Sequence, residues 1–420
     1  MKSAFLKARL TAFLLGHHLR ALLARRVPPA TLVRSLQKQL VVSSLFRDAK
    51  YSQVGDKVFI DPFAPYFPSP YCTKLFNHNT DGAYPPKPNF AQLSITTLCP
   101  CQCVHCHVKN TQGPELPADL LLRTIGEIAE ADFPLIFFVG GEPMSRFADL
   151  LEFITAARRY MDTRIFTSGV GVNPSRLQRL KQAGLEGICV SLDHHEERIH
   201  NAKRNHPAAF RAACETIRAA SAMGFYVSVV CCTTRPMVAS GDTFKVVDLA
   251  ESLGAHSIQL NEIRPVGRAL ESAGYDFYLT DGEKQTLIDY YRRSNRSRRS
   301  IAIVMPWFNE EPDKFGCTAT AGQQAYIDAQ GNLQPCPLLK VGFGNIRERS
   351  FRDIWEAFRS QCRHPIRECV VHRVADELRQ SAVLPLPVKR AYELWPEMCR
   401  LEATEVFNRL RSIDGAEERG

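Results

Sequence analysis

An α/β fold with a parallel sheet is predicted by the way apolar and amphipathic segments alternate through the middle of this 420-residue chain. Six short apolar runs of strand length are separated by longer segments whose apolar residues recur with helical spacing. Six such strand–helix units predict a parallel sheet with helices outside it. Right-handed crossovers allow either a doubly wound sheet or a barrel, and composition does not decide between them.

The predicted strands and helices follow one another from residue 89 onward. The strands span 91–97, 135–139, 163–167, 187–192, 225–232 and 256–261. The helices between them span 118–130, 146–161, 174–183, 207–223 and 243–253. Hydrophobic residues make up 45% of the chain and charged residues 23%, which is typical of a globular protein with enough apolar material for a core.

The first 50 residues are predicted to form basic amphipathic helix. The first acidic residue is Asp48, and the basic residues before it are Lys2, Lys7, Arg9, Arg20, Arg25, Arg26, Arg34, Lys38 and Arg47. Three interpretations remain open: a helix packed on the rest of the protein, a helix lying on a membrane surface, and an organelle transit peptide. No apolar run is long enough to predict a transmembrane span, and Lys7 and Arg9 interrupt what would be a signal-peptide core.

A proline-rich segment follows over residues 61–88. Its prolines are Pro62, Pro65, Pro68, Pro70, Pro85, Pro86 and Pro88. Because proline lacks an N–H group and fixes φ, this segment cannot form a long helix, and we expect an extended arm over the next domain. A second basic cluster at 292–299 has no aromatic residues between its charges, so we expect the solvated end of a helix, and nucleic acid is not an expected partner.

The most informative motif is C-x-x-x-C-x-x-C, formed by Cys99, Cys103 and Cys106 directly after the first predicted strand. Three thiolates on one loop suit an iron–sulfur cluster and leave one iron of a four-iron cluster open. The alternative is a zinc site, to which Cys101, His105 and His107 could add ligands. The fourteen cysteines gather in two regions of the chain, which favours a reducing compartment over a disulfide framework.

A strand that ends in this cysteine loop resembles the radical S-adenosylmethionine (radical SAM) superfamily. The resemblance covers about residues 89–370. It implies a partial (β/α)6 TIM-type barrel whose active site lies at the C-terminal ends of the strands. It also implies a [4Fe-4S] cluster on Cys99, Cys103 and Cys106, whose open iron is chelated by the amino and carboxylate groups of S-adenosylmethionine (SAM).

The resemblance further implies residues that bind SAM at the ends of the next strands. They are Gly140, Gly141, Glu142, Pro143, Ser168, Ser191, Asp193 and Arg204. The Gly-Gly-Glu-Pro segment matches the family motif for the SAM amino group, since a carboxylate accepts hydrogen bonds from an ammonium. Ser168 stands where family members often carry asparagine, and Asn205 replaces the usual glycine after the arginine. Arg204 would pair with the SAM carboxylate.

The second cysteine region resembles the SPASM/twitch extension of radical SAM enzymes. A hairpin is predicted over residues 325–336, and the residues implied as ligands of one auxiliary iron–sulfur cluster are Cys317, Cys336, Cys362 and Cys369. Cys399 is a possible substitute, and a zinc site is the alternative. Four regions are therefore predicted: an N-terminal helical region and arm (1–88), the partial barrel (89–295), a small α+β cluster domain (300–370) and a helical tail (371–420).

The function implied by the resemblance is that of an enzyme. SAM would be cleaved reductively to a 5′-deoxyadenosyl radical that removes hydrogen from an unactivated C–H bond, with electrons from a flavodoxin or ferredoxin. We expect a hydrophobic or lipid-like substrate or a small metabolite, with peptide modification as the alternative. A non-catalytic zinc or iron–sulfur redox protein is the hypothesis from another class. The expected location is cytoplasmic, with peripheral membrane contact through the N-terminal helix.

Overall fold

A single open sheet forms the centre of the computed structural model. The structure describes residues 2–23, 29–80, 86–108, 114–271, 277–381 and 383–413. Arg25, Arg26 and Pro85, which contribute to the predicted basic segment and arm, lie outside these ranges. Within them, nine strands are hydrogen-bonded in the order β11-β10-β3-β4-β5-β6-β7-β8-β9.

The six predicted strands are neighbours in this sheet and run parallel. They are β3 (Phe90–Ser94), β4 (Leu135–Val139), β5 (Asp162–Thr167), β6 (Gly187–Ser191), β7 (Tyr226–Thr233) and β8 (Ser257–Glu262). The end strands do not pair with each other, so the predicted partial barrel is confirmed. The predicted strand 91–97 is too long, because the chain leaves the ladder after Ser94 and turns toward the cysteine loop.

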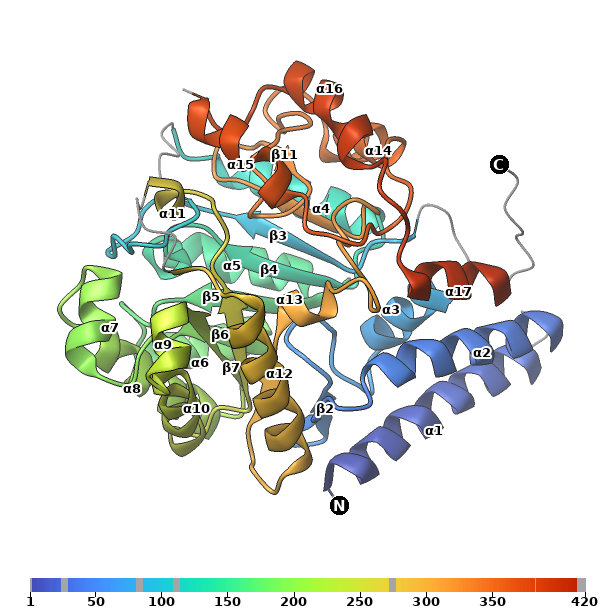
Figure 1. Cartoon of the computed structure of the whole chain (residues 1–420), viewed down its shortest axis with the longest axis horizontal. Coiled ribbons are helices and arrows are strands. Elements are labelled where there is room, and N and C mark those ends of the chain that lie inside the picture. The colour runs from blue at the N-terminus through green and yellow to red at the C-terminus, as the bar shows by residue number, and fades with distance from the viewer. Residues whose placement is uncertain are drawn as a thin grey trace.

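Helices that alternate with these strands lie outside the sheet (Figure 1). They are α4 (Ala118–Glu130), η1 (Pro143–Arg146), α5 (Phe147–Ala157), α6 (Pro174–Ala183), α7 (Glu197–Arg204), α8 (Ala209–Ala222), α9 (Arg235–Ala239), α10 (Asp242–Ser252), α11 (Arg268–Glu271) and α12 (Asp281–Arg296). Helix α4 shows why they form: Leu121, Ile125 and Ile128 recur on one face and are buried against the sheet.

The sheet continues beyond the predicted barrel. Strand β9 (Ala302–Val304) pairs with β8, and β10 (Gln324–Ile327) pairs in parallel with β3. Strand β11 (Leu333–Gln334) completes the predicted hairpin, whose turn needs the left-handed backbone of Gly331. The hairpin therefore places the second cysteine region beside the strand that carries the first.

The N-terminal region packs through its arm onto the inner face of the barrel sheet, where the ring of Phe63 lies 5.6 Å from that of Phe137. Its elements are α1 (Lys2–Leu23), α2 (Pro29–Leu45), β1 (Ser52–Val54), β2 (Lys57–Phe59) and α3 (Pro70–Thr80). The 11-residue helix α3 corrects the expectation of a wholly extended arm, and it starts at Pro70 because proline is tolerated in a first helical turn. The buried Arg164 donates to the carbonyl groups of Pro62 and Ala64, which ties the arm to β5.

In the part of the chain that the structure describes, five helices follow the barrel, and aromatic packing joins two of them, α14 (Phe351–Arg359) and α16 (Val388–Met398). The others are α13 (Pro306–Asn309), α15 (Val371–Gln380) and α17 (Glu405–Ile413). The ring of Phe343 lies 4.7 Å from that of Phe358 and 5.1 Å from that of Trp395. Among the helices that the structure describes, none is long and apolar enough to cross a bilayer.

Candidate active site

One cavity of about 840 Å³ reaches both cysteine regions. Residues at the C-terminal ends of six strands line it: Thr96, Gly140, Ser168, Ser191, Cys232 and Asn261. Cys99, Cys103 and Cys106 lie on one part of its wall, and Cys317, Cys336 and Cys369 on another. Ile60, Phe63 and Ala64 of the N-terminal arm also line the cavity. The strand ends thus form the site expected of a barrel.

The backbone of the first cysteine loop is hydrogen-bonded on two sides, by the end of α7 and by Arg268. Gln102 N–H donates to the Arg204 carbonyl and Val104 N–H to the Lys203 carbonyl, each at 3.0 Å, so the end of α7 pairs with the loop. Arg268 donates through its backbone N–H to the Cys106 carbonyl and through its guanidinium to the Cys103 carbonyl. A Cβ on Gly267 would lie 2.2 Å from the Cys106 oxygen, so only glycine fits there.

The thiols of this loop differ in acidity. A hydrogen bond from the Cys101 thiol, assisted by the Arg204 guanidinium, lowers the pKa of Cys103 to about 6. The Cys101 hydrogen bond also lowers the pKa of Cys99, while burial raises the pKa of Cys106. Because thiolates are the ligands of iron–sulfur clusters, three cysteines on one wall, with a guanidinium 3.6 Å from one sulfur, fit such a group.

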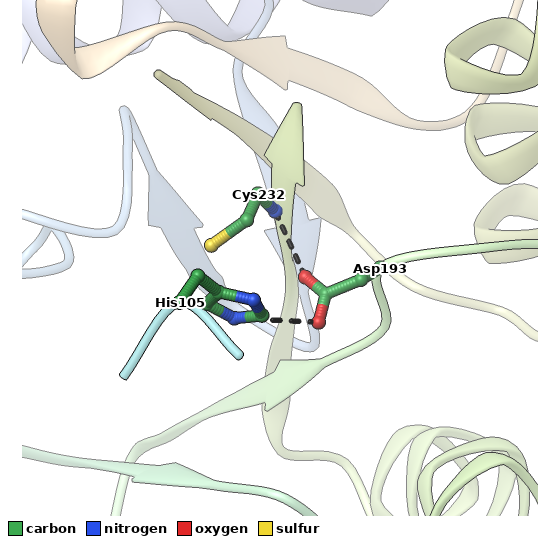
Figure 2. A group of neighbouring side chains, drawn as sticks. All are labelled: His105, Asp193 and Cys232. Carbon is green, nitrogen blue, oxygen red and sulfur yellow. Dashed lines mark hydrogen bonds and ion pairs between the residues drawn. The ribbon is translucent and has the colours of Figure 1, made fainter. Parts of the chain in front are cut away.

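Asp193 joins three elements behind the loop. Its carboxylate accepts from the Cys232 N–H at 2.9 Å, lies 2.6 Å from the Arg204 guanidinium and 3.6 Å from His105 Nε2. Figure 2 shows His105, Asp193 and Cys232 converging from the loop, from the segment after β6 and from the end of β7. Burial lowers the pKa of His105 to about 4, so this imidazole is neutral. Asp193 itself does not line the cavity; it holds residues that do.

Arg204 is therefore engaged with the protein. The resemblance implies a clamp on the SAM carboxylate, whereas the structure shows the guanidinium between Asp193 and Cys103. Burial alone would raise the pKa of Asp193, but the Arg204 guanidinium keeps this pKa below its ordinary range. Arg204 still lines the cavity, so its role toward SAM stays a prediction.

Glu142 and Ser168 form a hydrogen-bonded pair at the ends of β4 and β5. One carboxylate oxygen of Glu142 accepts from the Thr167 hydroxyl and the Met144 N–H, and the other accepts from the N–H and hydroxyl of Ser168, both at 2.7 Å. Burial raises the pKa of Glu142. The serine that replaces the usual asparagine thus orients the acidic residue of the Gly-Gly-Glu-Pro motif.

The two glycines of that motif are required by close backbone packing. A Cβ on Gly140 would lie 2.5 Å from the Thr96 carbonyl oxygen, and one on Gly141 would lie 2.3 Å from the Leu98 carbonyl oxygen. Pro143 opens η1 and does not line the cavity. The glycines therefore let the loop after β4 pack against the loop that leads into the cysteines.

The second group brings together three of the four predicted cysteines. Cys317 is anchored by its N–H to the Ile366 carbonyl, Cys336 follows β11, and Cys369 precedes α15. Burial raises the pKa of Cys336 to about 12 and that of Cys369 to about 11, and the charges of these thiols act on one another. Three thiols on one wall fit a cluster with a further ligand from the cavity side.

Cys362 is not part of this group. It lies at the end of α14, where its thiol donates to the Phe358 carbonyl, and its nearest titratable cysteine is Cys399. Neither of these two lines the cavity. The structure thus does not support Cys362, or Cys399 in its place, as the fourth ligand, because Cys362 after α14 and Cys399 at the end of α16 both lie in the hydrophobic core.

Sequence reasoning missed several residues around the second group. Glu310 is partly buried, burial raises its pKa, and its charge acts on Cys317 and Cys336. Arg264 lies 3.0 Å from Glu262 and 3.8 Å from Glu310. These charged residues carry no motif, and only the tertiary fold brings them to the cysteines.

Comparisons with known proteins agree with this geometry. The sequence model of the radical SAM superfamily matches residues 93–253, and that of the SPASM iron–sulfur cluster-binding domain matches residues 317–377. The chain is 30% identical over 297 residues to an AdoMet-dependent heme synthase of Methanosarcina barkeri, covering 64% of this chain and 82% of that protein. It is 27% identical over 321 residues to the AdoMet-dependent heme synthase of Nitratidesulfovibrio vulgaris, covering 69% and 86%.

A solved structure supports the fold. Streptococcus suis SuiB bound to S-adenosylmethionine superposes with a TM-score of 0.54 at 15% identity, over 70% of this chain and 75% of SuiB. At that identity the likeness concerns the fold alone. It agrees with the partial barrel described above.

Proposed function

Because this chain belongs to the radical SAM superfamily and carries a SPASM-type cluster domain, we propose that it removes a hydrogen atom from an unactivated C–H bond of a hydrophobic small metabolite. The proposed substrate class is a tetrapyrrole. Electrons would come from a low-potential donor such as a flavodoxin or ferredoxin. The observation that carries the proposal is the single cavity shared by both cysteine groups.

The cofactors of the proposed reaction supply the radical chemistry. When bound, SAM and the [4Fe-4S] cluster supply a 5′-deoxyadenosyl radical, and the auxiliary cluster supplies a site for an electron. We assign the first cluster to Cys99, Cys103 and Cys106, and the auxiliary cluster to Cys317, Cys336 and Cys369. The remaining ligand of the auxiliary cluster would come from the cavity side, where Glu310 and the substrate are the candidates.

The residues around the cavity orient these groups and exclude water. Glu142, held by Ser168 and Thr167, would present a fixed carboxylate to the SAM amino group. Ser191 lines the same wall and is the proposed contact for the SAM carboxylate or ribose. The walls remove the reacting atoms from solvent, which protects a radical from stray hydrogen donors.

The tetrapyrrole proposal rests on the relatives and on the walls of the cavity. Two relatives that match over more than four-fifths of their own length are named AdoMet-dependent heme synthases. The aromatic residues of the cavity wall are Phe46, Phe63, Phe76, Phe90, Phe166, Trp307 and Phe315. Such a wall suits a flat, largely apolar macrocycle, and the arginines Arg264 and Arg268 suit its carboxylates.

The test is an anaerobic assay with the reconstituted, reduced protein and SAM. Iron porphyrins that differ in their number of propionate side chains should raise 5′-deoxyadenosine formation above the substrate-free rate and should themselves lose mass. A Cys99→Ala, Cys103→Ala, Cys106→Ala variant is the control without the first cluster. Stimulation by peptides or acyl lipids, with none by porphyrins, would remove the tetrapyrrole proposal and leave the radical SAM assignment standing.

We also propose that the N-terminal helices contact an anionic membrane surface. Helix α1 buries Leu6, Leu10 and Leu14, yet its opposite face carries an exposed apolar stripe. The stripe consists of Phe5, Ala8, Ala12, Leu15, Leu19 and Leu23, at helical spacing. No acidic residue precedes Asp48, so the flanking charge is wholly basic and complementary to anionic lipids.

The position of these helices agrees with a hydrophobic substrate. Helices α1 and α2 lie side by side at one edge of the molecule (Figure 1). Val42 of α2, Phe46 after it, and Leu75 of α3 line the cavity. A molecule held in a bilayer would therefore meet an apolar wall that leads toward the site.

Vesicle sedimentation tests the membrane proposal. The full chain should bind phosphatidylcholine vesicles that contain phosphatidylglycerol, and the double variant Leu15→Gln, Leu19→Gln should lose roughly tenfold or more of this affinity. The matched control is Val383→Gln, Val388→Gln, which alters two other exposed side chains. Unchanged binding by the α1 variant, or self-association that the variant abolishes, would show that lipid does not cover the stripe.

A further inference from the structure

A buried cation, Lys340, follows the hairpin that carries Cys336 of the second group. The residue is 5% exposed and follows Cys336 by four positions, in the segment after β11. Its Nζ has no hydrogen-bond partner among the residues that the structure describes. A buried ammonium without a hydrogen bond is costly, so its surroundings must compensate the charge in another way.

The pairing of β10 with β3 explains how Lys340 approaches the first group as well as the second. The ring of Tyr326 on β10 lies 5.1 Å from Lys340 Nζ and 6.4 Å from the ring of His107. His107 directly follows Cys106. In their thiolate forms, Cys336 and Cys106 would each stabilise the Lys340 ammonium. One cysteine from each group therefore lies within electrostatic reach of the same cation.

No carboxylate among the described residues forms an ion pair with this ammonium. Asp328 is an acidic group whose charge acts on it. That carboxylate already accepts the backbone N–H groups of Gln330 and Asn332, and the side-chain amides of Asn332 and Gln334, which close the hairpin turn. Burial lowers the pKa of Lys340 to about 8, so the ammonium still predominates at neutral pH.

We propose that Lys340 is a positioning residue shared by the two cluster sites, whose fixed positive charge raises the reduction potential of both clusters. The inference rests on the assignment of Cys106 and Cys336 as cluster ligands under the proposed function. A thiolate-ligated cluster gains negative charge on reduction. A buried cation nearby stabilises the reduced form more than the oxidised form, because the low dielectric of the interior leaves the interaction weakly screened.

The proposal is tested on the reconstituted full chain by potentiometric titration monitored by electron paramagnetic resonance. Lys340→Met removes the charge and keeps the length of the side chain, and both reduction potentials should become more negative. Lys340→Arg retains the charge and should keep both potentials close to the wild-type values. The charge-matched control is Lys57→Met, which removes a lysine that is paired with Glu186 and does not line the cavity.

The thermal stability of the cluster-free chain separates this role from a structural one. Because Lys340 has no hydrogen bond to lose, Lys340→Met should leave the melting temperature unchanged or raise it. A large fall in melting temperature, unchanged potentials, or a shift in one potential only would each overturn the shared role. Failure of the Met variant and of Lys340→Gln to assemble clusters would also overturn it and indicate a role in assembly. A wild-type chain that binds no cluster would instead refute the proposed function.

Discussion

The two cysteine groups face one cavity but are built in opposite ways. The first comes from eight consecutive residues, Cys99–Cys106, whose backbone is clamped by the end of α7 and by Arg268. The second collects Cys317, Cys336 and Cys369 from three segments that are 19 and 33 residues apart in turn, held by the hairpin and by the Ile366 carbonyl. Local sequence can therefore specify the first site, whereas the second exists only after the chain has folded.

Their electrostatic surroundings differ as well. In the first group a hydrogen bond and a guanidinium lower the pKa of Cys103 to about 6. In the second, burial dominates and raises the pKa of Cys336 to about 12, with Glu310 adding a like charge. Cys99 and Cys103 of the first loop thus favour thiolates before any cofactor binds, while Cys106 and the second group depend on the positive charge of bound iron.

The largest expected effect comes from removing a ligand of the first group. Cys106→Ala should abolish 5′-deoxyadenosine formation and lower the iron content by about four atoms per chain. Iron and acid-labile sulfide analysis, with the nucleoside measured by chromatography, checks both. If Cys106→Ala still formed 5′-deoxyadenosine, the first loop would not hold the cluster that cleaves SAM, and the contrast between the two groups would be wrong.

Substitution of Cys369 and of Cys362 tests which cysteines belong to the second group. Cys369→Ala should lower the iron content by about four atoms per chain while 5′-deoxyadenosine still forms. Cys362→Ala should keep the full iron content, because this thiol is turned into the aromatic core and away from the cavity. The same iron and sulfide analysis on both variants decides the point: equal iron loss would restore Cys362 as a ligand.

Cys362 also shows what the sequence could and could not predict. The alternation of periodicities predicted β4, α4 and α6 to the residue, since each is bounded by turn residues and has one strongly apolar face or run. The motif spacing predicted the first loop, because its ligands are local. Cys362 follows in the right order along the chain, yet order says nothing about the direction of a thiol at the end of α14. Lys340 and Glu310 carry no motif at all, since tertiary pairing alone places them.

An intermediate effect is expected where Asp193 supports the first loop. Asp193→Asn leaves the buried Arg204 guanidinium without its ion pair, and should destabilise the cluster-free chain by about 3–5 kcal/mol at pH 7. Because the pKa of Asp193 is lowered in the folded state, its stabilisation is present above the ordinary value of about 4 and is lost as pH falls below it.

Urea unfolding of wild type and Asp193→Asn between neutral pH and pH about 3 measures this linkage. The difference between the two proteins should be greatest at neutral pH and should shrink below about pH 4. A difference that stays constant across this range would mean that the ionised carboxylate is not what stabilises the loop.

The smallest expected effect is the change in stability caused by two glycine-to-alanine substitutions, one beside the first loop and one inside α4. Gly141→Ala would bring a Cβ to 2.3 Å from the Leu98 carbonyl oxygen, so the loop after β4 must move, at a cost of about 1–3 kcal/mol. Gly126→Ala, inside α4, meets no atom within 4 Å and should stabilise the chain by about 0.5–1 kcal/mol through its higher helix propensity. Urea unfolding compares the two, and opposite signs are expected. If Gly141→Ala is also neutral or stabilising, the close packing of the two loops does not hold the first site, and its rigidity must come from α7 and Arg268 alone.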